Sequence, residues 1–539
     1  MKKHNAIKVV LVTILLCMLL TWIIPSAVFN SEFADQGRVQ MGLFDLFNYP
    51  LTSLSYFGNI SLFIIVVGGF YGILYKIPAY RNLLDAIAKK GSKRGMLTIS
   101  IIMILLAVIT SICGLQIGLM LFFPFIVSLI LLMGYDKIVA ALTVVGSTMV
   151  GVVGTTYGYG NVSILTQYLS LDLADNILVK VIILVVGLVL LIFNTALYVK
   201  KNNTIKKVTK KESKNDEVAT LIEKEVEVVE KPVEKKSTKT NTKSKKSSSK
   251  TTSKTTSKKT TKSKNNNKAA VKDSDVIIVK ESLNEDDNLV PTATNSLLKS
   301  WPVMVALVIL FVILVLAFIP WNTAFGLNIM TDAKEAVYGF KLFGFELFAK
   351  LLGNINAFGE WMINDIVLVM AILVLLLSLI YKLKFQDVLD GFVAGAKKAL
   401  APAVVTLFIY TVLVITTYHP FQLTIYKWIL TITKEFNIFT SSVVAMLAGL
   451  FNADPTYAFQ SVVPYLTSVV TNAKVYPIVE IVFQSMYGFV MLLAPTSVVL
   501  MSTLSYLGVS YKEWLKSIWK LLVELLVILL IIFTILVLI

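Results

Sequence analysis

Apolar runs of about 20 residues recur along the whole chain, and no other feature constrains its fold as strongly. A helix of roughly 20 apolar residues crosses the roughly 30 Å hydrocarbon core of a bilayer. The clearest runs are residues 7–29, 60–75, 177–199, 303–319, 366–380 and 521–539. Only 15% of the 539 residues are charged, whereas about a quarter are charged in a soluble domain. The sequence therefore predicts an all-α polytopic membrane protein.

The first apolar run follows a basic start, "MKKHNAIK", as in a secretory signal peptide. The apolar part is too long for such a peptide, and "TWIIPSAVF" offers no cleavage site of small residues. We expect the run to be the first membrane helix. Its basic end places the N-terminus in the cytoplasm by the positive-inside rule.

Residues 200–298 interrupt the apolar pattern with a stretch rich in Lys, Ser, Thr and Asn. No apolar periodicity supports a packed core there, so the segment is predicted to be a disordered basic linker. It separates an N-terminal membrane half, residues 1–199, from a C-terminal membrane half, residues 299–539. Nucleic acid or anionic lipid head groups are alternative partners for such a linker. We favour a solvated cytoplasmic tether and expect no nucleic-acid partner.

Basic residues between the apolar runs give one consistent topology. Residues 75–95, 381–400 and 510–520 are rich in Lys and Arg and are assigned to the cytoplasm with the linker. An additional apolar run, residues 401–418, then crosses outward. The second half of the chain therefore continues in the opposite orientation to the first half.

Aligning the chain with itself indicates an internal repeat. Residues 115–140 align without a gap on residues 455–480, so that Pro124 falls on Pro464. Polar or helix-breaking residues stand at the centre of an apolar hairpin in each half, in "TSICGLQIG" and "FNADPT". Each hairpin is followed by a span interrupted by Gly or Pro beside hydroxyl groups. We expect two inverted repeats, each with a re-entrant hairpin and a broken helix, and such repeats enclose a substrate site.

Asp454 is the most informative single residue, because a carboxylate in lipid costs about 2.5 kcal/mol or more. It is expected to face a hydrated site. It also fits the N-cap of a helix that has Pro455 at its first position, and the two roles are compatible. Gly68 and Gly72 have the spacing of a helix-packing motif. Gly114 and Gly118 share that spacing inside a hairpin centre, where packing and function both remain open.

Motifs for an enzyme are missing from the sequence. It contains no HExxH, GxSxG or Walker A motif, and Cys17 and Cys113 both lie in apolar runs. A hydrolase built on Asp454 would lack a second catalytic group. No metal site and no cofactor are expected. A channel or a structural membrane scaffold is the alternative to a transporter.

The chain resembles the YfcC-like permeases, relatives of the DcuC-type C4-dicarboxylate carriers of the ion transporter superfamily. The resemblance lies in "TWIIPSAVF", "VVGGFYGILYK", "MGYDKIVAALTVV", "FQSMYGF" and "LAPTSVVLMSTLSYLGVSYKEWLK". It implies an elevator-type ion transporter fold, a homodimer, and a solute bound between two hairpin tips. Tyr487 stands where the family pattern has an acid before Gly488, and both tips depart from the family pattern. The substrate and the coupling ion therefore stay open.

These observations predict a secondary active transporter in the bacterial plasma membrane, surrounded by lipid. It would move a small organic solute, a carboxylate or an amino acid, coupled to Na⁺ or H⁺. The residues expected to line the substrate site are Gly114, Gln116, Thr155, Thr156, Asp454, Thr456, Gln484, Thr496 and Ser497.

Overall fold

The computed structural model describes residues 5–30, 32–226, 289–292, 298–433 and 435–539. Residues 1–200 and 283–539 form one compact unit, so the two membrane halves pack together, and residues 201–282 are a second unit. Helix α9 (Ile177–Val226) continues well past residue 199. The beginning of the segment predicted to be disordered is therefore helical, whereas most of the predicted linker lies outside the described residues.

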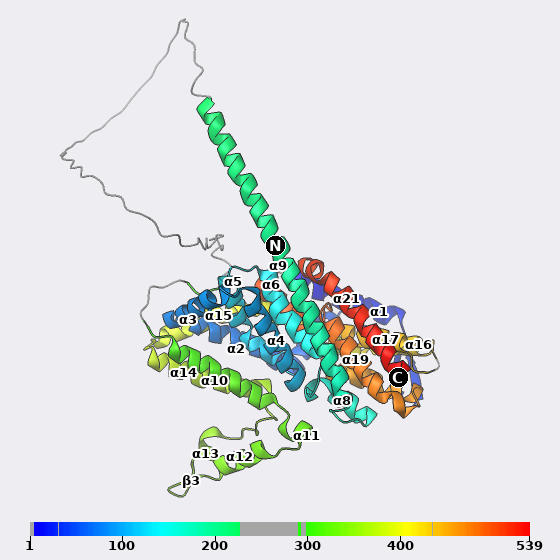
Figure 1. The fold of residues 1–539 in the computed structure, drawn as a ribbon. Coiled ribbons are helices and arrows are strands. Elements are labelled where there is room, and N and C mark those ends of the chain that lie inside the picture. Colours follow the sequence, from blue (N-terminus) through cyan, green and yellow to red (C-terminus); the bar gives the residue numbers. More distant parts are fainter. Residues whose placement is uncertain (1–4, 31, 227–288, 293–297, 434) are drawn as a thin grey trace, which may run out of the picture. The chain divides into compact units, whose positions relative to one another are not determined.

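Eight helices within the described residues are long and apolar enough to cross a membrane. Figure 1 shows them packed through the compact unit. They are α1 (Asn5–Ile23), α2 (Asp45–Leu74), α4 (Met96–Cys113), the first part of α9, α10 (Trp301–Phe318), α14 (Ile363–Ile380), α15 (Phe385–Tyr418) and α21 (Tyr511–Leu538). The prediction of a helical multi-pass membrane protein is confirmed.

The burial of these helices differs in a way that separates lipid-facing from central ones. In the apolar 18-residue segment of α15, 72% is buried inside the protein, whereas only 22% is buried in the corresponding segment of α21. Apolar side chains that avoid water and are not covered by protein need lipid around them. Most of the apolar segment of α21 is therefore left uncovered by the rest of the chain, as expected of a peripheral membrane helix, and α15 forms part of the core.

Helices α2 and α15 make the most extensive helix contact in the structure. Gly68 and Gly72 of α2 face Gly391 and Gly395 of α15. A Cβ added to Gly395 would lie 2.0 Å from the Gly68 carbonyl oxygen, so only glycine permits the backbones to approach this closely. The packing role expected for Gly68 and Gly72 is confirmed, and their partner motif lies on α15.

The first half of the chain contains a helical hairpin and an interrupted helix. Helix α4 ends at a tip of residues 114–117, and the chain returns through the 3₁₀ turn η2 (Gly118–Phe122) and α5 (Phe123–Leu132). The next span consists of α6 (Lys137–Ala141), the π-helical turn η3 (Leu142–Gly146) and α7 (Ser147–Val153). It breaks at residues 154–158 and continues as α8 (Tyr159–Leu169).

The second half repeats this order of elements. Helices α17 (Ile438–Phe451) and α18 (Pro455–Val469) form a hairpin with its tip at residues 452–454. After the turn η5 (Ala473–Val475), helix α19 (Tyr476–Met491) breaks at residues 492–497 and continues as α20 (Val498–Leu507). The inverted orientation of the two repeats stays a prediction.

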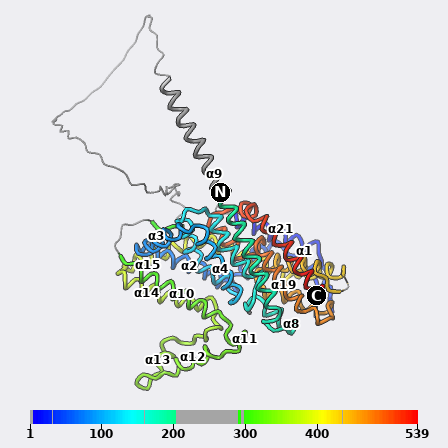
Figure 2. The backbone as a smooth tube through the Cα atoms, in the orientation of Figure 1, coloured from blue at the N-terminus to red at the C-terminus, as the bar shows by residue number. Residues whose placement is uncertain are grey.

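The remaining elements connect these parts. The amphipathic helix α3 (Pro78–Ser92) joins α2 to the first hairpin, and α16 (Phe421–Leu430) joins α15 to the second. The tube in Figure 2 shows α10 and α14 lying side by side. The short helices α11 (Trp321–Phe325), α12 (Ile329–Tyr338) and α13 (Leu347–Leu352) connect them. In the part of the chain that the structure describes, strands occur in two small β-hairpins. They are β1 (Ser26–Asn30) with β2 (Glu32–Gly37) and β3 (Lys341–Leu342) with β4 (Phe345–Glu346).

Candidate functional site

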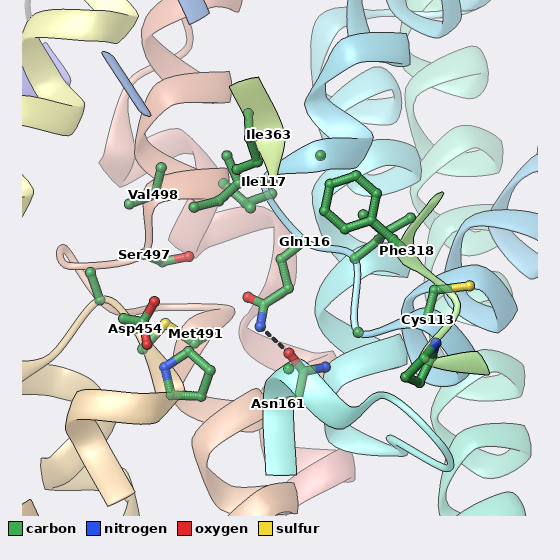
Figure 3. Close-up of a pocket in the computed structure, with 18 of the residues that line it drawn as sticks. Cys113, Gln116, Ile117, Asn161, Phe318, Ile363, Asp454, Met491, Ser497 and Val498 are labelled. Carbon is green, nitrogen blue, oxygen red and sulfur yellow. Dashed lines mark hydrogen bonds between the residues drawn. The ribbon is translucent and has the colours of Figure 1, made fainter. Parts of the chain in front are cut away.

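A pocket of about 460 Å³ lies where the two hairpin tips and the two helix breaks meet. Figure 3 shows Gln116 of the first tip between Asn161 of α8 and the group formed by Asp454, Met491 and Ser497. One further side of the pocket comes from α10, α14 and the segments next to them. The residues that line the pocket are Cys113 to Gly118, Gly160, Asn161, Phe318, Pro320, Thr323, Gly359, Ile363, Ala453 to Pro455, Met491 and Ser497 to Val499.

The first tip is fixed against the break of the first interrupted helix. Helix α4 ends at Gly114, which has the left-handed φ of +69° that glycine adopts most easily. The backbone of Gly114 lies against that of Gly158, and a Cβ on Gly158 would come within 2.8 Å of the Gly114 nitrogen. Close contact between two backbones explains why both positions are glycine.

Amide side chains form a directed chain of hydrogen bonds at this tip. The Gln116 Nε2 donates to Asn161 Oδ1 at 2.7 Å, and Asn161 Nδ2 donates to Thr155 Oγ1 at 3.1 Å. The Thr155 hydroxyl in turn donates to the Val152 carbonyl at 2.9 Å. Gln116 is partly exposed in the pocket, whereas Thr155 is fully buried. The chain therefore orients the Gln116 amide, whose remaining polar atoms are available to a ligand.

Each hairpin is bonded to its own interrupted helix by a threonine at an equivalent position. The Thr156 amide and hydroxyl both bond to Ser111 on α4, with the Thr156 N to Ser111 O distance at 3.0 Å. In the second half the Thr496 hydroxyl lies 3.0 Å from the carbonyl oxygens of both Gly449 and Leu450 on α17. These bonds satisfy carbonyl groups at helix C-termini, which have no partners within the helix.

The second tip is stabilised by its own polar residues. The Asp454 Oδ1 accepts a hydrogen bond from the Thr456 amide at 2.8 Å and so caps α18, which has Pro455 at its first position. The Asn452 Nδ2 donates to the Ala448 carbonyl at 3.0 Å. From α19, the Tyr487 hydroxyl donates to the Ala453 carbonyl at 3.1 Å. The capping role expected for Asp454 is confirmed.

Helix α19 also joins the second half of the chain to the first. Gln484 Nε2 donates to the Thr155 carbonyl at 2.7 Å, and Ser485 Oγ donates to the Val153 carbonyl at 3.0 Å. A Cβ on Gly488 would lie 2.4 Å from the Val153 nitrogen, so α19 and α7 pack backbone to backbone. The hairpins and the interrupted helices of both halves are therefore connected.

The electrostatics of the pocket come from helix termini and one carboxylate. Helices α8, α18 and α20 all begin at the pocket. The Val498 and Val499 amides, in the first turn of α20, have no hydrogen-bond acceptor among the described residues. Free amides at a helix N-terminus favour an anion. Asp454 is the one charged residue in the lining, and it has no cationic partner within the described part of the chain.

Four of the nine predicted site residues line the pocket. They are Gly114, Gln116, Asp454 and Ser497. The other five are not in the lining. Thr155, Thr156 and Thr496 bond to backbone or to neighbouring helices. The Thr456 amide donates a hydrogen bond to Asp454, and the Gln484 side chain donates one to the Thr155 carbonyl. A direct substrate contact by any of the nine stays a prediction.

Sequence reasoning missed Asn161 and Tyr487 as parts of the site. Asn161 lines the pocket directly after the glycines of "YGYGNVS", and an amide next to a predicted helix break was the available signal. In the sequence, Tyr487 stands out only as a departure from the family pattern. Its hydroxyl holds the second tip, a contact that depends on the packing of α19 and has no local sequence signal.

A multi-pass helical protein with two interrupted helices around a pocket is characteristic of a membrane transporter. Residues 4–242 and 279–538 match the model of the DcuC family, the C4-dicarboxylate anaerobic carriers. The chain belongs to this family and is a carrier, not an enzyme. No curated protein and no solved structure matches the chain. The narrower resemblance to the YfcC-like permeases stays a prediction.

Proposed function

We propose that this protein is a secondary carrier that moves a C4-dicarboxylate across the bacterial plasma membrane, coupled to Na⁺ or H⁺. The substrate binds in the pocket between the hairpin tips. Membership of the carrier family supports the substrate class. The observation that supports the binding site is the pair of unbonded amides of Val498 and Val499, two residues that line a pocket of a size suited to a small solute.

The two carboxylates of the substrate have different partners in this proposal. The first carboxylate binds the amides of Val498 and Val499 and the Ser497 hydroxyl, because the positive end of the α20 dipole lies there. The second carboxylate accepts a hydrogen bond from the Gln116 amide, which Asn161 holds in place. Amide and hydroxyl donors bind a carboxylate more weakly than a bidentate ion pair with Arg does. Weaker binding suits a site that must also release its substrate.

Asp454 accounts for coupling in this proposal. A dianionic substrate beside a carboxylate meets repulsion, and this repulsion is strong where water is excluded. A cation that neutralises Asp454 removes this repulsion. Na⁺ or a proton therefore binds together with the substrate. The substrate and the cation then favour each other's binding, which is the reciprocity that a coupled carrier needs.

The transport movement follows from the connections between elements. The bonds Thr156–Ser111, Thr496–Gly449 and Gln484–Thr155 support a single moving body made of both hairpins and both interrupted helices. Helices α2 and α15, joined through their glycines, belong to the scaffold. In the elevator-like cycle that we propose, the moving body of hairpins and interrupted helices slides past the scaffold. The protein acts as a homodimer whose N-termini are cytoplasmic.

An amino acid is the second candidate substrate, and one observation favours it. Asp454 has no cationic side chain beside it among the described residues, so an ammonium group of the substrate could take the place of the coupling cation. The carboxylate would still bind at α20. The two candidates differ in whether binding needs an added cation.

A ligand stability screen on purified protein tests the proposal. Succinate, its uncharged diamide and amino acids are compared with and without Na⁺, at pH values on both sides of neutrality. A ligand at 100 times its Kd adds roughly 2.7 kcal/mol of stability. We expect stabilisation by succinate, none by the diamide, and a dependence on Na⁺ or pH that disappears in Asp454→Asn. Stabilisation by amino acids alone would support the second candidate, and no stabilisation by any solute would favour a channel or scaffold.

A further inference from the structure

Residues 289–292, near the end of the segment predicted to be a disordered linker, are instead packed against the membrane body. Leu289 is only 6% exposed and belongs to the hydrophobic core, and Pro291 is buried as well. A connecting segment normally runs over the surface, where water satisfies its backbone. This segment instead obtains hydrogen-bond donors from the protein, so it is bound in the manner of a peptide ligand.

Three side chains bind the backbone of this segment. The Leu289 carbonyl accepts hydrogen bonds from the Tyr75 hydroxyl at 3.0 Å and from Ser128 Oγ at 2.6 Å. The Pro291 carbonyl accepts one from Arg81 Nη1 at 2.5 Å. Arg81 is itself held by Asp85, with 2.8 Å between Arg81 Nε and Asp85 Oδ2. Such recognition through carbonyl groups depends on the path of the segment more than on its side chains.

The three donors come from different parts of the proposed machinery. Tyr75 directly follows α2, which is bonded to α15 in the scaffold, and Arg81 lies on the connecting helix α3. Ser128 lies on α5, the returning arm of the first hairpin. Tyr75 and Ser128 are 3.3 Å apart through their hydroxyl oxygens, and the Leu289 carbonyl bonds to both. One carbonyl group therefore bridges the scaffold and the hairpin.

We propose that residues 289–292 are an internal brake on transport, bound against α3, α5 and the C-terminal end of α2. While the segment is bound, it opposes sliding of the first hairpin past α2. Movement of the hairpin requires at least the Leu289 contacts to break. The brake presupposes the hairpin movement of the proposed function, and it connects the rate of that movement to the linker.

Removing the two hydroxyl donors tests the brake. Tyr75→Phe with Ser128→Ala keeps the packing of the Tyr75 ring and the Ser128 Cβ atom and deletes both hydrogen bonds to Leu289, together with the direct contact between the two hydroxyls. Loss of one such bond shifts an equilibrium by roughly two- to tenfold. Because two bonds are lost, we expect the initial rate of succinate uptake into proteoliposomes to rise by at least such a factor, with the succinate Kd unchanged. Ser100→Ala is the matched control, because the Ser100 hydroxyl bonds only within α4 and its loss should leave the rate unchanged. A folded double variant with an unchanged or lower rate would overturn the proposal.

A labelling experiment tests the brake without relying on uptake. Leu289→Cys is reacted with a membrane-impermeant maleimide, since Cys17 and Cys113 are both buried. We expect slow labelling in the otherwise wild-type protein and labelling that is several-fold faster when Tyr75→Phe and Ser128→Ala are added. Equal labelling rates in the two backgrounds would show that these donors do not hold the segment, which would overturn the brake. Faster maleimide labelling in the donor variants, together with no succinate uptake, would instead count against the proposed substrate.

Discussion

Gln484 in the second half of the chain donates a hydrogen bond of 2.7 Å from its Nε2 to the carbonyl oxygen of Thr155 in the first half. Both residues are buried, and Thr155 lies at the break of the first interrupted helix. The carbonyl has no helical partner because α7 ends at Val153. One side chain of α19 thus completes the hydrogen bonding of a break in the other half of the chain, and so joins the two halves beside the candidate site.

Gln484→Leu is predicted to destabilise the protein. The variant leaves the buried Thr155 carbonyl without its donor, at a cost of about 1–3 kcal/mol. We expect a lower thermal denaturation midpoint in detergent and slower uptake, with succinate affinity little changed because Gln484 does not line the pocket. Gln386→Leu is the control, since Gln386 is exposed and bonds only to Asp390 on the same helix. Equal stability of the two variants would contradict the role of Gln484.

Asp454→Asn is predicted to abolish coupled uptake while leaving expression and folding intact. Asparagine caps a helix about as well as aspartate, so α18 keeps its N-cap. The negative charge that we propose to hold the coupling cation is lost. Uptake driven by a Na⁺ or pH gradient is the measurement, with Asp365→Asn as control, because Asp365 caps α14 outside the pocket. Unchanged gradient-driven uptake in Asp454→Asn would remove Asp454 from the coupling site.

Lys180 and Glu480 form a fully buried ion pair between α9 and α19, with 2.8 Å between Lys180 Nζ and Glu480 Oε1. Lys180→Met alone leaves an uncompensated buried carboxylate and should cost about 3–5 kcal/mol. Replacing both residues, by Lys180→Met with Glu480→Leu, should restore most of that loss, because no buried charge remains. Thermal denaturation midpoints of the two single variants and the double variant give the comparison. Additive losses would mean that the two side chains do not interact.

Gly395→Ala is predicted to prevent correct folding. The new Cβ would lie 2.0 Å from the Gly68 carbonyl oxygen, and backbone on both sides leaves no room to adjust. Gly58→Ala on α2 is the matched control, because the Cβ there approaches only the Leu54 side chain. Size-exclusion profiles and yields in mild detergent provide the measurement. A normal monodisperse profile for Gly395→Ala would show that α2 and α15 do not pack through these glycines.

Much of the membrane architecture is predictable from sequence because lipid forces apolar residues into helices. Both hairpin tips are predictable because polar and helix-breaking residues, such as Asp454, stand isolated within apolar runs. The extent of α15 is not predictable in this way. Residues 385–400 contain acidic and basic side chains that indicate a cytoplasmic loop. They are helical because Gly391 and Gly395 pack against α2, and that contact joins residues far apart in the chain.

The site was only partly predictable for similar reasons. Asp454 and Gln116 are polar in apolar surroundings, which the sequence displays directly. The role of Asn161 depends on its bond to Gln116, 45 residues earlier, and needs the folded tip to be seen. The binding of residues 289–292 depends on backbone carbonyls, so neither composition nor periodicity predicts it.

Uptake of labelled succinate into proteoliposomes that contain the purified protein is the most direct test of the account. An inward Na⁺ or proton gradient is imposed, and Asp454→Asn proteoliposomes serve as the matched control. The account predicts accumulation of succinate above the level of the control and its loss when the gradient is dissipated. Equal, gradient-independent succinate levels in wild-type, Asp454→Asn and protein-free liposomes would contradict a coupled C4-dicarboxylate carrier.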